Sequence, residues 1–283
     1  MSFFFFGDMG SGESAQIKVA QAMKDNINNK TMFICGLGDN IYEDGCSSVD
    51  DPLFETHFER PYSIISDKIP FYMCLGNHDY GYSDIPLNRK KNAGYQVLYS
   101  KKSKKWKMPY NYYTFTKKMK GVTVQIFVMD TNLDEQTDEE IKKQFDYMKN
   151  EIKKSKADWK IVNGHHTWRS IAGHGNAEEK LEELLMRLVN ESPFDVYMCG
   201  HDHNKQVIEL ITNGKRVNLV VCGAGGKIYH DGLNNYDNLD DNSDLKFCSN
   251  NLGYGICYPS KNKLQLKFHN ELNELEYQCY FVK

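Results

Sequence analysis

The sequence predicts an α/β fold in which two mixed β-sheets pack face to face as a sandwich, with helices on their outer faces, so that four layers form. Three observations carry this prediction. Short apolar runs recur along the chain, helical patterns separate several of them, and strand-like runs joined by turns follow from residue 253 onward. No linker of altered composition divides the chain, so we expect a single domain over residues 1–283.

Seven apolar runs are expected to form strands that are buried on both faces. Each is short, continuous and rich in β-branched or aromatic side chains, which is typical of strands inside a sandwich. They cover residues 3–6, 32–35, 71–75, 122–129, 159–162, 196–199 and 219–222. Three later runs, at residues 253–258, 264–269 and 276–281, are separated by turns and predict antiparallel strands.

Helices are predicted where apolar residues recur at helical spacing. One such stripe consists of Ile141, Phe145, Met148 and Ile152, and a second consists of Leu181, Leu184, Leu185 and Leu188. A further helix is expected to be capped by Ser11 or Ser14 and to run to about Asn29. Residues 234–244 are expected to form a polar loop.

The composition argues against several classes of partner. The net charge is −3 and the isoelectric point is about 6.3, so no global charge favours nucleic acid or a membrane surface. No apolar run reaches the ~20 residues of a membrane-spanning helix, and residues 1–6 lack the basic start of a signal peptide. We therefore expect a soluble, intracellular monomer that binds neither nucleic acid nor membranes. The basic run at residues 101–107 is interpreted as a solvated loop.

The eight cysteines are expected to be mostly reduced, as in an intracellular protein. Since no C-x-x-C motif occurs, a structural zinc site is not expected. Cys248 and Cys257 flank a turn and are the pair to examine for a disulfide. Four others end apolar runs, where a free thiol behaves as a small apolar side chain: Cys35, Cys74, Cys199 and Cys222.

Polar residues stand directly behind a glycine at the ends of five apolar runs. The segments are Gly7-Asp8, Gly38-Asp39-Asn40-Ile41-Tyr42, Gly76-Asn77-His78-Asp79, Gly164-His165 and Gly200-His201-Asp202-His203. Open α/β sheets place their ligand sites at the carboxyl ends of strands. Taken singly, each segment is more simply interpreted as an ordinary turn. Together they predict a metal site, because oxygen ligands mixed with imidazoles suit iron, manganese or zinc.

Other polar residues near these segments are given plainer interpretations. Asp79 and Asp202 are expected to orient ligands or to form turns. The glycines at residues 223–226 lack the spacing of a phosphate-binding loop and are expected to let a loop approach the metals. Three histidines outside the segments are expected to be ordinary surface or core residues: His57, His230 and His269.

The five segments resemble the metal-binding loops of the calcineurin-like metallophosphoesterases, which read D-x-H, G-D, G-N-H-D/E, H and G-H-x-H. The sequence departs from that pattern at Gly10, where most members carry a histidine, and the second loop supplies Tyr42 instead. This exchange is typical of the purple acid phosphatases, in which the tyrosine binds a ferric ion as phenolate. Further stretches resemble the mammalian-type, tartrate-resistant branch: residues 106–110, 127–131, 163–175, 199–204 and 223–225.

The resemblance implies a role for each residue of a binuclear metal centre. A first ion, Fe3+, would be held by Asp8, Tyr42 and His203. A second ion, which would be Fe2+, Zn2+ or Mn2+, would be held by Asn77, His165 and His201, and Asp39 would bridge the two ions. His78 and His174 match histidines that contact phosphate and help to protonate the leaving group. His166 and Thr167 stand where the family has an aromatic residue and a proline.

The resemblance therefore implies a phosphomonoesterase in which a metal-activated hydroxide attacks phosphorus in line. Its substrate would be a phosphorylated small molecule or a phosphoprotein. A phosphodiesterase, nucleotide pyrophosphatase or protein phosphatase that uses manganese or zinc is an alternative within the same superfamily. A metal-binding scaffold without turnover is an alternative from a different class.

Overall fold

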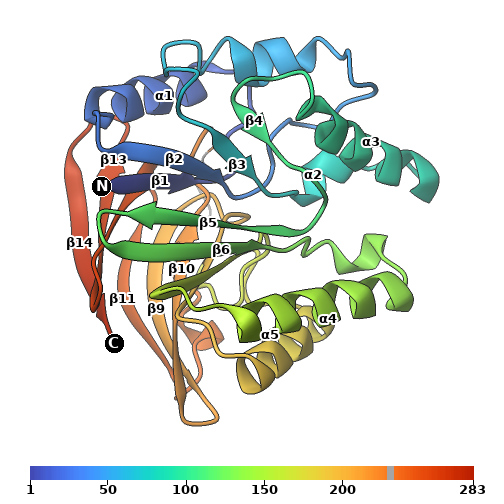
Figure 1. Cartoon of the computed structure of the whole chain (residues 1–283). Helices are drawn as coiled ribbons and strands as arrows, with labels where there is room; N and C mark the ends of the chain where they lie inside the picture. The colour runs from blue at the N-terminus through green and yellow to red at the C-terminus, as the bar shows by residue number, and fades with distance from the viewer. Residues whose placement is uncertain (228–232) are drawn as a thin grey trace.

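Two stacked β-sheets form the centre of the molecule in the computed structural model, which describes residues 1–227 and 233–283 (Figure 1). The first sheet has the strand order β14-β13-β12-β1-β2-β3-β4. Its strands are β1 (Ser2–Phe6), β2 (Thr31–Gly36), β3 (Phe71–Met73), β4 (Trp106–Lys107), β12 (Gly253–Pro259), β13 (Lys263–Asn270) and β14 (Leu275–Val282). Strands β1 to β4 are parallel to one another, whereas β12, β13 and β14 continue the sheet in antiparallel pairing.

The second sheet is mixed in the same way and has the strand order β11-β9-β10-β8-β7-β6-β5. Its strands are β5 (Tyr113–Met119), β6 (Val122–Val128), β7 (Trp159–Asn163), β8 (Val196–Cys199), β9 (Lys205–Thr212), β10 (Lys215–Cys222) and β11 (Ser243–Ser249). Strands β6, β7, β8 and β10 are parallel, and antiparallel strands complete both edges. The predicted α/β sandwich of two mixed sheets is confirmed.

Helices cover the outer faces of both sheets, so the predicted four layers are present (Figure 1). The helices are α1 (Ser14–Asn26), α2 (Asn77–Tyr80), α3 (Pro86–Tyr99), α4 (Asp138–Lys154) and α5 (Glu179–Glu191). Single turns occur at η1 (Glu55–Glu59), η2 (Leu133–Glu135) and η3 (Tyr236–Asn238). The stripes predicted for α4 and α5 face inward and pack on the second sheet, whereas α1 packs on the first. Within the described residues, no helix is both long and apolar enough to cross a membrane.

The apolar runs predicted as strands all form strands, but four strands and the helices α2 and α3 were not predicted. Strands β5 and β11 carry charged residues on half-exposed faces, and β9 begins with the buried polar residues Lys205 and Gln206, so none of the three is a continuous apolar run. The prediction for α1 was wrong at both ends. Its N-cap is Glu13 without a side-chain cap, and the helix ends at Asn26. Ser11 accepts a hydrogen bond from the Glu13 amide before the helix begins.

Two further interpretations, for residues 101–107 and 234–244, need correction, and a third concerns a residue that the structure does not describe. The run at residues 101–107 is not a solvated loop throughout, because Lys105 is buried and Trp106 packs in the core as part of β4. The buried Lys105 ammonium donates to the carbonyl of Tyr62, 2.5 Å away, and lies 3.5 Å from Oδ1 of Asp67. The expected loop at residues 234–244 contains the η3 turn and the start of β11. His230 lies outside the described residues.

All eight cysteines are free thiols. Cys248 lies in β11 of the second sheet and Cys257 in β12 of the first, so the pair examined for a disulfide stands on different sheets. The four cysteines expected to act as small apolar side chains are buried, which confirms that interpretation.

Candidate metal centre

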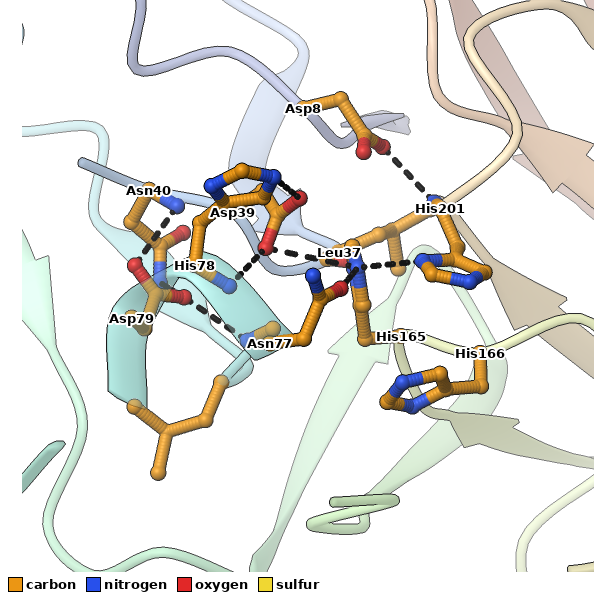
Figure 2. A network of polar contacts seen from close by, with 12 residues as sticks. Asp8, Leu37, Asp39, Asn40, Asn77, His78, Asp79, His165, His166 and His201 are labelled. Atoms are coloured by element: carbon orange, nitrogen blue, oxygen red, sulfur yellow. Dashed lines mark hydrogen bonds and ion pairs between the residues drawn. The ribbon is translucent and has the colours of Figure 1, made fainter. Parts of the chain in front are cut away.

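The predicted ligands come from loops that follow parallel strands of both sheets. Asp8 follows β1, Asp39 and Tyr42 follow β2, and α2 begins with Asn77 after β3. From the second sheet, His165 follows β7, and His201 and His203 follow β8. Figure 2 shows side chains from both sheets turned toward one another, with contacts that run from Asp39 to His78, from Asn77 to His165, and from His165 to His201.

The first group of ligands surrounds the phenol oxygen of Tyr42. This oxygen lies 3.2 Å from Oδ1 of Asp8, 3.0 Å from Oδ2 of Asp39 and 3.1 Å from Nε2 of His203. Nε2 of His203 is in turn 3.3 Å from Oδ1 of Asp8. The donor atoms of Asp8, Asp39 and His203 lie within 4.8 Å of one another, so a single ion can reach all three. All four side chains are buried.

The second group of ligands surrounds Nε2 of His165. This nitrogen lies 3.0 Å from Oδ1 of Asn77, 3.2 Å from Nδ1 of His201 and 3.4 Å from Oδ1 of Asp39. Asp39 therefore turns one carboxylate oxygen toward each group. The predicted ligand set is brought together completely, with Asp39 between the two halves.

The atoms of the second group suit a cation. Nδ1 of His165 lies 2.8 Å from the carbonyl of Leu37, which only accepts, so Nδ1 carries the proton and Nε2 has a lone pair when the ring is neutral. That lone pair faces the carbonyl oxygen of Asn77. Two acceptors at hydrogen-bond distance repel unless a positive charge lies between them. Without a metal ion, that charge is a proton on Nε2: burial opposes it, but the Asp39 carboxylate outweighs burial and raises the pKa of His165 to about 10.

The electrostatics of Tyr42 and Asp39 show what each can do without a cation. Burial, followed by the carboxylates of Asp39 and Asp8, raises the pKa of the Tyr42 phenol well above its usual range. Burial also acts against the Asp39 carboxylate, but His165 and His78 outweigh it and hold the pKa of Asp39 below its usual range. Asp39 is therefore ionised, whereas Tyr42 becomes a phenolate only beside a strongly acidic cation.

Backbone strain is concentrated at the ligands. Within the described residues, six non-glycine residues have a positive φ, and three of them are Asp8 (56°), Asp39 (51°) and His201 (71°). The other three, Lys120, Asn213 and Asn273, lie in turns between antiparallel strands. A positive φ costs of order 1–3 kcal/mol outside glycine and is common at functional sites. The surrounding fold thus stabilises three ligand residues in backbone conformations that are unfavourable for non-glycine residues.

The structure gives a physical reason for the exchange of a histidine for Tyr42. A Cβ atom on Gly10 would lie 1.9 Å from the carbonyl oxygen of Asn40, so no side chain fits at residue 10. The carbonyl of Gly10 instead accepts from the Tyr42 amide at 3.0 Å. Similarly, a Cβ on Gly223 would lie 2.6 Å from Oδ2 of Asp8, which confirms that the loop at residues 223–226 closely approaches a ligand.

Asp79 and Asp202 hold the ligand loops in place, as expected. The buried carboxylate of Asp79 accepts five hydrogen bonds of 2.7–3.2 Å, donated by the amides of Asn40, Ile41 and Gly76 and by the side chains of Asn40 and Gln96. It thereby joins the loop that carries Asp39 to the loop that carries Asn77. Asp202 accepts from the Ser170 hydroxyl and from the amide of His174, 3.0 Å away.

A cleft of about 570 Å³ opens beside the second group and is lined by Asn77, Tyr82, His166, His174 and His201, among others. The exposed ring of His174 stacks on that of His201, with centroids 4.1 Å apart. His78 lies on the other side, where its Nε2 is 3.9 Å from Oδ2 of Asp39. Both outer histidines of the prediction therefore flank the ligands.

Three residues of the site were not predicted. The Tyr82 hydroxyl contacts both Asn77 and His78, and Nζ of Lys227 lies 3.9 Å above the Tyr42 ring. The Thr131 hydroxyl accepts from the amides of His165 and His166. Tyr82 and Lys227 each follow a glycine, but that glycine does not directly follow an apolar run, so the signal that identified the ligands is incomplete at both positions. Thr131 lies two residues after the predicted run at residues 122–129, but no glycine precedes it, so only the strand part of the signal that identified Asp39 and His165 is present.

The comparisons with known proteins agree with this geometry. Residues 1–205 match the family model of the calcineurin-like phosphoesterases. The mouse tartrate-resistant acid phosphatase type 5 is 32% identical over 252 residues, which are 80% of this chain and 72% of the mouse protein. Purple acid phosphatase 4 of Arabidopsis thaliana is 28% identical over 95% of this chain and 80% of its own length. Among solved structures, GAP50, described as the anchor in the inner membrane complex of Plasmodium, superposes with a TM-score of 0.83. That match has 24% identity and covers all of this chain and 89% of GAP50.

Proposed function

This chain belongs to the calcineurin-like phosphoesterases, in the branch of the purple acid phosphatases, and from that premise we propose that it is a phosphomonoesterase with a binuclear metal centre. Metal-dependent hydrolysis of phosphate esters is the reaction of this family. The observation that carries the finer proposal is the position of Asp39, whose two carboxylate oxygens face two separate groups of donors.

We assign the first group, Asp8, Tyr42 and His203, to a ferric ion. The charge of that ion would stabilise the Tyr42 phenolate, which burial and two carboxylates otherwise oppose. We assign the second group, Asn77, His165 and His201, to Fe2+, Zn2+ or Mn2+, since one amide oxygen and two imidazoles suit a divalent transition ion. When bound, such a pair supplies a water of lowered pKa and positive charge that stabilises the transition state.

The protein's own residues bind and orient the phosphate ester and move a proton. The cleft beside the second group has room for the organic part of a substrate, since ligand pockets commonly measure about 300–1,000 Å³. His174 lies at the mouth of this cleft against His201 and is suited to donate a proton to the departing oxygen. Asp202 orients the loop of His174 through the backbone amide. His78, beside Asp39, is suited to contact the phosphate.

The substrate is proposed to be a phosphorylated small molecule or a phosphoprotein. Tyr42 and Gly10 argue against a phosphodiesterase with manganese or zinc in both positions, because a phenolate ligand is useful only to a more acidic ion. The second candidate is a role as an anchor without turnover, because GAP50, which shares the fold, is described as an anchor. The likeness to GAP50 concerns the fold alone. The intact ligand set and the flanking histidines support catalysis over that candidate.

A metal titration with an activity readout tests the proposal. The metal-free protein would be loaded with increasing equivalents of Fe3+ and then Zn2+, and hydrolysis of 4-nitrophenyl phosphate would be measured at each step. The proposal predicts that activity appears only as the second equivalent binds. Full binding of two ions without hydrolysis of 4-nitrophenyl phosphate or an alkyl phosphate would instead favour the scaffold, and activity that is complete with a single ion would contradict the binuclear centre.

A further inference from the structure

A chain of hydrogen bonds leads from a backbone carbonyl to the ligand Asn77. Nδ1 of His78 lies 2.6 Å from the carbonyl oxygen of Glu43, and Nε2 of His78 lies 3.1 Å from the hydroxyl of Tyr82. The same hydroxyl lies 3.0 Å from Nδ2 of Asn77. The opposite end of the Asn77 amide, Oδ1, faces Nε2 of His165 in the second group of ligands.

The first member of this chain determines which nitrogen of His78 carries a proton. The Glu43 carbonyl can only accept, so His78 carries its proton on Nδ1. Where Nε2 presents a lone pair, the Tyr82 hydroxyl donates to it, and the Tyr82 oxygen accepts from the amide nitrogen of Asn77, 3.0 Å away. The chain therefore leaves the amide oxygen, and not the nitrogen, facing the ligands.

We infer that Tyr82 is a positioning residue that holds the Asn77 amide with its oxygen toward the second metal ion. This inference rests on the proposed binuclear centre. The two ends of an asparagine amide have almost the same size, so packing alone does not choose between them. A reversed amide would present two N–H donors to the cation and would supply no ligand. Partners behind a ligand commonly change metal affinity by about 10–100-fold.

Tyr82 is well suited to a specific test because it contributes little to the core. Its side chain is 59% exposed, so Tyr82→Phe removes the hydroxyl with little effect expected on folding. Tyr110, which is 56% exposed and lies outside the residues lining the cleft, offers a matched control in Tyr110→Phe. Tyr42 reports on the first ion separately through its colour with iron, so the two positions can be followed independently.

The experiment titrates Zn2+ into the iron-loaded protein, with a competing chelator as the indicator. We expect Tyr82→Phe to lower the affinity for Zn2+ by about 10–100-fold while the iron absorption stays unchanged, and Tyr110→Phe to behave as wild type. Unchanged Zn2+ affinity in Tyr82→Phe would overturn the inference. A wild-type protein that binds iron but no second ion would instead contradict the binuclear centre, and the inference with it.

A second pair of variants shows whether Tyr82 acts through the amide. Asn77→Asp offers two equivalent oxygens and has no N–H group to orient, so adding Tyr82→Phe to this background should cost little further affinity. Each affinity is measured by the same Zn2+ titration, and the four proteins form a double-mutant cycle. An equal loss from Tyr82→Phe in both backgrounds would show that Tyr82 does not act by orienting Asn77.

Discussion

The phenol oxygen of Tyr42 lies 3.1 Å from Nε2 of His203, although 161 positions separate the two residues in the chain. Tyr42 follows β2 of the first sheet, and His203 follows β8 of the second. An ion bound by both therefore links the loops of the two sheets. The second group does the same through Asn77 and His165. The proposed metals are thus part of the connection between the two halves of the sandwich.

Metal removal should therefore destabilise the protein measurably. A ligand present at 100 times its dissociation constant stabilises the folded state by about 2.7 kcal/mol. For a chain of this size, that corresponds to a rise in Tm of about 4–5 °C. Thermal unfolding of the chelator-treated and the metal-loaded protein would measure the difference. An identical Tm under both conditions would argue that the loops hold no metal.

Two variants should separate the ligands from the outer residues. Asp39→Asn removes the carboxylate shared by both groups and should lose metal and activity together. His174→Ala removes a side chain that touches no proposed ion, so it should keep both metals and slow turnover by about 10²–10⁴-fold. Metal analysis and kcat on the same preparations give the comparison. Equal metal loss in the two variants would mean that His174 belongs among the ligands.

The leaving group should reveal the proton donor. If His174 protonates the departing oxygen, His174→Ala should impair hydrolysis of an alkyl phosphate far more than hydrolysis of 4-nitrophenyl phosphate, because nitrophenolate leaves without a proton. The ratio of kcat/KM for the two substrates, measured in wild type and variant, isolates this effect from substrate binding. The same fractional loss with both substrates would assign His174 a role in binding rather than in proton transfer.

Asp79 should matter for folding rather than for chemistry. Asp79→Asn would turn an amide N–H₂ toward groups that are all donors, so at least one hydrogen bond to the carboxylate would be lost. A hydrogen bond to a charged group contributes about 1.5–3 kcal/mol. Chemical denaturation of the metal-free protein should show a loss of at least that size. The exposed Asp84 provides the control, since Asp84→Asn should change stability by less than about 0.5 kcal/mol.

The sequence predicts the ligand residues best where an apolar run identifies a strand and a glycine marks the turn that follows it. Asp8, Asp39 and His165 could be found because each follows a buried strand and a glycine, which fixes where the side chain emerges. Tyr82 could not be found, since its role depends on how α2 turns its loop back toward Asn77. Lys105 shows the same limit. Its buried ammonium contacts Tyr62 and Asp67, and the sequence near Lys105 does not reveal these contacts.

Polarity at sheet edges explains why strands β5 and β11 were missed. Strand β5 alternates aromatic residues with threonines and then carries Lys117 and Lys118, and it forms one edge of the second sheet, whereas β11 forms the other edge. Edge strands are commonly protected by charged side chains, which removes the apolar run that identifies a central strand. Helix α3 has only a few buried positions, so its sequence likewise lacks a continuous apolar stripe.

The visible spectrum of the iron-loaded protein tests the central claim most directly. Tyr42 is buried between two carboxylates and should become a phenolate only when it binds Fe3+, so the protein should show a violet to pink charge-transfer band. The measurement compares wild type with Tyr42→Phe at equal, independently determined iron content. The account predicts a band in wild type that disappears in Tyr42→Phe. A colourless wild-type protein with stoichiometric Fe3+ bound at this centre, or a band that persists in Tyr42→Phe, would contradict it.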